Sequence, residues 1–116
     1  MALFSAHRDL QNDPKIVLEA VIQDGKVLQF AHRDLQNNPD IVLAAVKQNG
    51  FALQFAHSDF RKDPKVVLEA VKNDGLSYSL IHPDLRSNEE IALAALAQNK
   101  LAKRYMPDFQ TDPRFK

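Results

Sequence analysis

The chain has 116 residues, no cysteine, and equal numbers of basic and acidic residues, 15 of each. Without cysteine it cannot form a disulfide framework, a thiolate metal site or a cysteine nucleophile. The balanced charge disfavours nucleic-acid binding, which normally shows a basic excess. Residues 1–6 are too short and too soon followed by charge to be a classical signal peptide. No apolar run approaches the roughly 20 residues that span a bilayer, so no membrane segment is expected.

A repeat with a period of 25 residues dominates the sequence, as the step from His7 to His32 illustrates. The segment AHRDL at 6–10 recurs at 31–35, and related segments follow at 56–60 and 81–85. A second block, which begins DPKIVLEAV at residue 13, recurs in the same phase from residues 38, 63 and 88. We therefore predict a single helical-repeat domain over 1–116, with units starting near 1, 26, 51 and 76 and a partial fifth unit at 101–116.

The second block predicts a helix of about ten residues, because it carries matched signals at its two ends. A residue suited to N-capping begins each block, and a proline follows it in three of the four blocks. These predicted caps are Asp13, Asn38, Asp63 and Asn88. A glycine stands beyond the far end, where we expect a left-handed residue to close the helix. These glycines are Gly25, Gly50 and Gly75.

The first block predicts a shorter helix, followed by a turn over the AHRDL segment. Its apolar residues include Val27, Leu28 and Phe30. Each unit is thus predicted to be helix, turn, helix. A helix of ten residues is unstable alone in water, so neighbouring units must stabilise it. The predicted fold is all-α, a short right-handed-type solenoid of helix-turn-helix repeats.

The run NNPDIVLAAVKQNGFALQFA at 37–56 resembles a bacterial and protist family of helical repeats of unknown function, often found in effectors of intracellular bacteria. Size and copy number also resemble Legionella effectors that act on other effectors, associated with blocking a pair of ubiquitin-deamidating enzymes. The resemblance implies a protein partner, such as a ubiquitin-modifying bacterial effector, and no catalytic residues or cofactor. It implies a location in the bacterial cytoplasm or, after secretion, in the host cytoplasm. Glu89, Lys100 and Pro107 depart from the family pattern.

A histidine recurs in every unit: His7, His32, His57 and His82. Metal ligation needs nitrogens about 2 Å from one shared ion. Equivalent positions in stacked units lie roughly 8–10 Å apart, as packed helices do. The histidines can form a row but cannot converge on a metal. We expect each imidazole to close the first helix by pairing with a terminal carbonyl or the nearby aspartate.

The chain is not expected to be an enzyme. A catalytic triad needs a nucleophile beside its base, and the nearest hydroxyls, Ser5 and Ser58, do not recur. An active site is normally unique, whereas these residues are copied in every unit. The exposed helix position reads Lys15, Asp40, Lys65 and Glu90, which alternates in sign and is typical of a solvated face rather than of a phosphate-binding one.

Positions that break the repeat toward apolar residues are the candidates for binding a protein. Phe4 aligns with Gln29, Ile22 with Lys47, Phe51 with Lys26, and Tyr78 with Leu28. Aromatic anchors carry much of the energy of an interface. The alternative is that Phe4 and Ile22 seal the end of the stack, and that Phe51 and Tyr78 belong to the core.

The sequence therefore predicts a non-enzymatic protein-interaction module, acting as a regulator or inhibitor that covers a substrate-binding surface of a larger protein. The alternative is a self-assembling structural repeat, a homodimer formed through uncapped ends of the solenoid. Neither hypothesis involves nucleic acid, a membrane or a metal.

Overall fold

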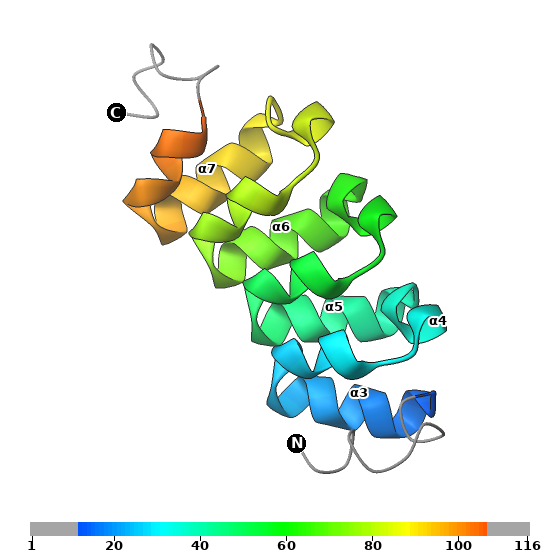
Figure 1. The fold of residues 1–116 in the computed structure, drawn as a ribbon. Helices are drawn as coiled ribbons and strands as arrows, with labels where there is room; N and C mark the ends of the chain where they lie inside the picture. The colour runs from blue at the N-terminus through cyan, green and yellow to red at the C-terminus, as the bar shows by residue number, and fades with distance from the viewer. Residues whose placement is uncertain (1–11, 107–116) are drawn as a thin grey trace.

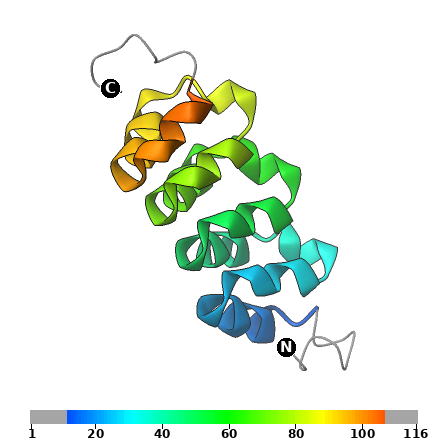
Figure 2. The ribbon, with the colours of Figure 1, turned by 60° about the vertical axis from the view of Figure 1, so that its left-hand side comes forward.

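The computed structural model describes residues 12–106, which form two layers of helices stacked along a rod (Figures 1 and 2). One layer holds four α-helices of ten residues each, and the other holds four 3-10 helices of six residues each. The α-helices are α3 (Pro14–Gln23), α5 (Pro39–Gln48), α6 (Pro64–Asn73) and α7 (Glu89–Gln98). The 3-10 helices are η1 (Gly25–Phe30), η2 (Gly50–Phe55), η4 (Gly75–Leu80) and η6 (Lys100–Tyr105). The described residues include no strand, so the predicted all-α solenoid is confirmed.

Each α-helix begins where the sequence predicts. The side-chain oxygen of Asp13 accepts hydrogen bonds from the backbone N–H groups of Lys15 and Ile16, at 3.0 and 3.3 Å. The other three predicted caps accept in the same way. A proline occupies the first helical position of α3, α5 and α6, where its missing N–H costs nothing. The four N-cap predictions are confirmed.

The segment predicted as a turn is itself helical. It contains α4 (Arg33–Gln36), η3 (Ser58–Lys62) and η5 (Pro83–Leu85) in three successive units. Each complete described unit therefore has three helical pieces instead of two. The backbone groups of a tight connection need partners, and one turn of helix supplies them locally.

The glycines lie beyond the ends of the α-helices, as predicted, but the predicted left-handed conformation was wrong. No glycine of the described residues has a positive φ. The preceding residue ends the α-helix instead, with extended geometry such as φ −151° at Asp24. Each glycine is buried at the start of a 3-10 helix, where an added Cβ would overlap a carbonyl oxygen of the next α-helix. For Gly50 that oxygen belongs to Ala70. The glycines are needed for close approach between units rather than for a left-handed turn.

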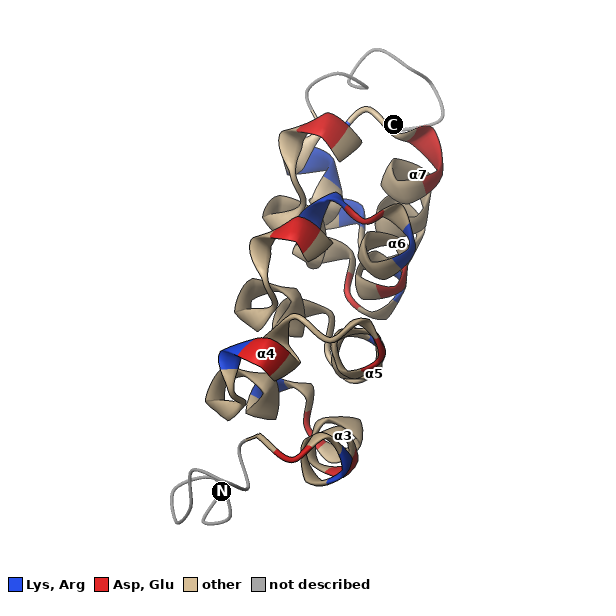
Figure 3. Ribbon diagram, turned by 90° about the vertical axis from the view of Figure 1, so that its right-hand side faces the viewer, with Lys and Arg blue, Asp and Glu red and all other residues tan. Residues whose placement is uncertain are grey.

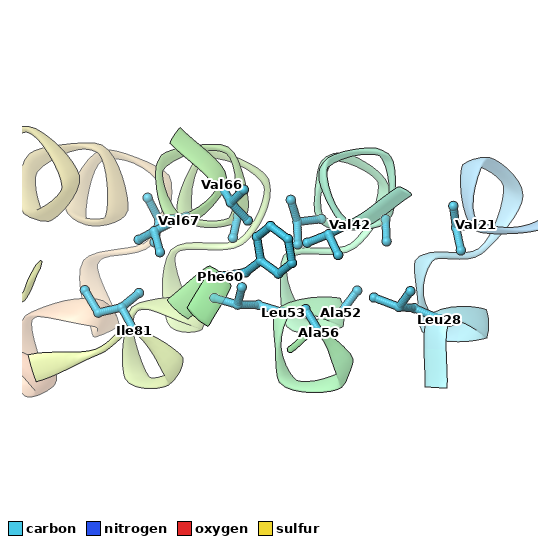
Figure 4. Close-up of a cluster of buried hydrophobic side chains, with 14 of the residues drawn as sticks. Val21, Leu28, Val42, Ala52, Leu53, Ala56, Phe60, Val66, Val67 and Ile81 are labelled. Atoms are coloured by element: carbon cyan, nitrogen blue, oxygen red, sulfur yellow. The ribbon is translucent and has the colours of Figure 1, made fainter. Parts of the chain in front are cut away.

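The core runs between the two layers along the whole rod (Figure 4). Val21 and Val42 of the α layer face Leu28 and Leu53 of the 3-10 layer, and all four side chains are fully buried. Phe60 of η3 closes the core at the connecting segments and is 8% exposed. Each α-helix packs against the next one along the chain, so the stability of every short helix depends on its neighbours.

Candidate functional site

Large apolar side chains that remain exposed mark the surface where a partner could bind. Three stand out among the described residues: Ile22 at 58%, Phe30 at 46% and Leu101 at 59% exposure. Single exposed apolar residues are ordinary on protein surfaces, so exposure alone does not define a site. Ile22 differs from the other two because it borders a hollow.

The hollow is a shallow, open depression between α3 and α5, lined by Ile22, Ala44, Lys47 and Gln48, with a volume of about 290 Å³. Ala44 leaves the space open, since the residue at the same place in α6 is the much longer Glu69. We name this feature the Ile22 groove. A mostly apolar lining that includes one lysine suits an apolar side chain accompanied by a carboxylate.

Gln48 belongs to the wall of the groove and also joins the two units. Its side-chain oxygen accepts a hydrogen bond from the backbone N–H of Gly25 at 2.6 Å. Asn73 plays the same part for Gly50, at 2.7 Å. Because this bond links α5 to the unit that precedes it, the groove is built on a fixed pair of elements.

The other candidate residues have different outcomes. Tyr78 is fully buried, and its hydroxyl donates to the backbone oxygen of Arg86. The alternative that Tyr78 belongs to the core is therefore confirmed, and its prediction as a partner-binding residue was wrong. A tyrosine at a leucine position of the core can be buried because the hydroxyl finds an acceptor. Phe51 is partly buried at the start of η2. Phe4 lies outside the described residues.

Phe30 was not predicted as an exposed residue, because it was taken with Val27 and Leu28 as one of the apolar residues of the first, shorter helix. In the structure the second layer is 3-10 helix, which has three residues per turn, so a reading based on the α-helical period assigns the wrong residues to its inner face. The same column contains Phe55, Leu80 and Tyr105, which are all partly buried.

The histidines cap helices, but at the end opposite to the predicted one. Nδ1 of His57 accepts a hydrogen bond from the backbone N–H of Asp59 at 3.2 Å, which makes His57 the N-cap of η3. His32 and His82 cap the equivalent segments in the same way. The expectation that each imidazole closes the preceding helix was therefore wrong. The expected contact with the nearby aspartate is found, since Nδ1 of each described histidine lies 3.5 to 3.7 Å from a carboxylate oxygen of the aspartate two residues later. His7 lies outside the described residues. Within 12–106, no group of three or more potential metal ligands comes together.

Charged residues of the α layer lie mostly on the side that faces away from the 3-10 layer (Figure 3). The second residue of each α-helix is exposed, and the series Lys15, Asp40, Lys65 and Glu90 alternates in sign along the rod. We refer to the outward side of α3, α5, α6 and α7 as the outer α face. Its basic residues are interrupted by acidic ones, which is unfavourable for binding a phosphate backbone.

These features define a solenoid of short helical repeats with a fixed groove and a charged outer face. The family model of a domain of unknown function (DUF4116) matches residues 1–36, 13–61 and 63–109, and the chain belongs to this family. No curated protein and no solved structure matches the chain. None of the helices in the described part of the chain has the length and apolar character needed to cross a membrane.

Proposed function

We propose that this chain is a non-catalytic protein-binding module whose contact point is the Ile22 groove. The observation that carries the proposal is the exposure of Ile22, at 58%, beside a hollow that it lines together with Ala44. The equivalent residues are Lys47, Lys72 and Ala97, so folding of a unit does not require an isoleucine there. An exposed apolar side chain next to a pre-formed hollow favours contact with another protein.

The absence of catalysis is part of the same proposal. The three described histidines use Nδ1 to cap helices, which is a structural task repeated in each unit. By resemblance to the Legionella effectors that act on other effectors, the partner is a ubiquitin-deamidating bacterial enzyme. The module inhibits it by covering the surface that receives ubiquitin. The rod is 52 Å long and 21 Å wide, which is large enough for the roughly 800 Å² per partner of a standard interface.

The test measures binding to a purified ubiquitin-deamidating effector of Legionella by calorimetry, together with its deamidation of ubiquitin. Two substitutions copy residues that the fold already accepts at equivalent places, Ile22→Lys and Ala44→Glu. Ile22→Lys removes the apolar side chain, and Ala44→Glu fills the hollow with a charged one. Losing the contact of one buried aliphatic side chain, ~1.5–3 kcal/mol, weakens binding at least about tenfold. Both variants are expected to keep the melting temperature of the wild type.

Ala94→Glu is the matched control, because it makes the same change on α7, away from the groove. It should leave binding and inhibition unchanged. Wild-type protein that neither binds nor inhibits the enzyme would contradict the proposed partner. Binding that Ile22→Lys and Ala44→Glu leave intact would move the contact to another surface.

A further inference from the structure

On the outer α face, two properties of equivalent residues alternate from one unit to the next. They therefore repeat every two units, whereas the fold repeats every unit. The sign of the exposed charge alternates in the series Lys15, Asp40, Lys65 and Glu90. The size of the side chain one turn further along each α-helix also alternates, in the series Glu19, Ala44, Glu69 and Ala94. Folding of a single unit does not demand this alternation, since both kinds of residue occur on equivalent helices.

An alternating series with four members has a special property: read backwards, it has the opposite sign at every place. Consider two copies whose outer α faces meet about a two-fold axis that runs parallel to the α-helices and passes between α5 and α6. The order of the helices is then reversed in the second copy, so that α3 faces α7 and α5 faces α6. Lys15 of each copy then faces Glu90 of the other, and Asp40 faces Lys65. Under two-fold symmetry every such contact occurs twice. All four charged positions gain a partner of opposite sign.

The sizes match in the same arrangement. Glu19 of one copy lies opposite Ala94 of the other, and Glu69 lies opposite Ala44, so a long side chain meets a short one at each place. Ile22 lies opposite Ala97. One pair across the contact is unfavourable, because Lys47 of one copy faces Lys72 of the other. Glu69 is three residues before Lys72 on the same helix and can neutralise its charge.

We propose that the outer α face binds a second copy of this chain in this antiparallel, two-fold arrangement. Apolar contact adds to the charge pairs, because leucines at one position of each α-helix are only partly buried. They are Leu18, Leu43, Leu68 and Leu93. The formal net charge of zero removes the overall repulsion between copies that would oppose association. This proposal differs from a homodimer through the ends of the rod, because it uses the long side.

A different cause of the alternation must be separated from this one: opposite charges on adjacent helices also attract each other within one chain. Two single variants, Asp40→Lys and Lys65→Asp, distinguish the two causes. Each introduces a residue of the charge that already stands at the equivalent position of another unit, so both are expected to fold, as circular dichroism can verify. Each variant places two like-charged pairs across the proposed dimer axis.

Sedimentation equilibrium at low salt is the measurement. We expect the wild type to dimerise, and each variant alone to dissociate with a constant raised at least about tenfold. An equimolar mixture of the two variants should regain association. The lysine introduced at position 40 of one chain then faces the aspartate introduced at position 65 of the other, while the charges within each chain stay unfavourable. Raising the salt concentration should weaken the wild-type dimer.

Several results would overturn the proposal. Wild-type protein that stays monomeric up to about 1 mM, the weak end of specific association, excludes this dimer. A dimer that neither variant weakens forms through another surface. If the two variants do not associate when they are mixed, the alternation of charge is explained by contacts between adjacent helices of one chain. All measurements use the chain alone, so no result depends on a partner protein. Because Ile22 and Ala44 lie within the proposed dimer contact, the binding test on the Ile22 groove is made at concentrations at which the chain is monomeric.

Discussion

At the scale of the residue, the glycine that follows α3, α5 or α6 and begins the next 3-10 helix sets how closely neighbouring units can pack. Its position leaves no room for a Cβ, because the carbonyl oxygen of the next α-helix occupies that space. Its N–H is bonded to an amide side chain of the same neighbouring helix. A single backbone position thus combines a steric requirement and a hydrogen bond.

Gly50→Ala tests the steric requirement. The added methyl group would overlap the backbone oxygen of Ala70, which cannot move without moving α6. We expect a loss of roughly 1–3 kcal/mol in the free energy of unfolding, the usual cost of overpacking, measured by urea denaturation. In an exposed, compatible position the same kind of change would be neutral or stabilising.

Lys100→Ala is the matched control, because Lys100 stands at the position of the glycines and is exposed. It should change the stability little. If Gly50→Ala were as stable as the wild type, the units would have to separate without cost, and the close-approach role of the glycine would be wrong.

At the scale of the element, amide side chains join each α-helix to the unit before it. Oδ1 of Asn73 accepts from the N–H of Gly50, and its Nδ2 donates to the backbone oxygens of Lys47 and Gln48 at 3.0 and 3.3 Å. The C-terminal end of α5 and the start of η2 are thereby both tied to α6. These bonds satisfy carbonyls that the end of a helix leaves unpaired.

Asn73→Ala should therefore destabilise the protein by about 1–3 kcal/mol, since it leaves backbone groups at the unit junction without partners. Thermal denaturation followed by circular dichroism is the measurement. Asn73→Gln is the control, because glutamine stands at this position in α5 and α7 and Gln48 makes the corresponding bond to Gly25. Equal losses for both variants would indicate that the packing of asparagine matters and its hydrogen bonds do not.

The elements also show which features could be predicted from the sequence. The α-helices were predictable because N-cap residues and prolines act within one turn of the chain. The roles of Gly50 and His57 were not, because they depend on a neighbouring unit or on the type of a short helix. The 3-10 helices were expected only as short helices, so the exposure of Phe30 was missed.

The candidate site was predicted in part. Comparison of repeat copies identified Ile22, which breaks the pattern at an exposed position, and the structure places it beside a hollow. The same comparison selected Tyr78, which is buried, because a departure from the repeat does not reveal on which side of a helix a residue lies. The hollow is lined by Ala44, and the short side chain of this residue becomes informative only once it is compared with Glu69 at the equivalent place of α6.

At the scale of the whole molecule, the rod is a series of equivalent units, each bonded to its neighbours by the same contacts. The backbone N–H of His57 donates to the oxygen of Gln36, and that of His82 donates to the oxygen of Arg61. Since each bond recurs after 25 residues, a unit should be removable if the register of the remaining units is kept.

Deletion of residues 39–63 removes one unit in register. It joins Asn38 to Pro64, which preserves an N-cap followed by proline, and it places Asn73 where it can bond to Gly25. We expect this shortened protein to remain helical, with the same circular dichroism per residue and a cooperative transition several degrees lower, because one interface between units is lost. Deletion of residues 39–58, out of register, joins Asn38 to Asp59 and should abolish the cooperative transition. If both deletions abolish the cooperative transition, the units are not interchangeable. Stability would then depend on contacts that are made at only one place in the rod.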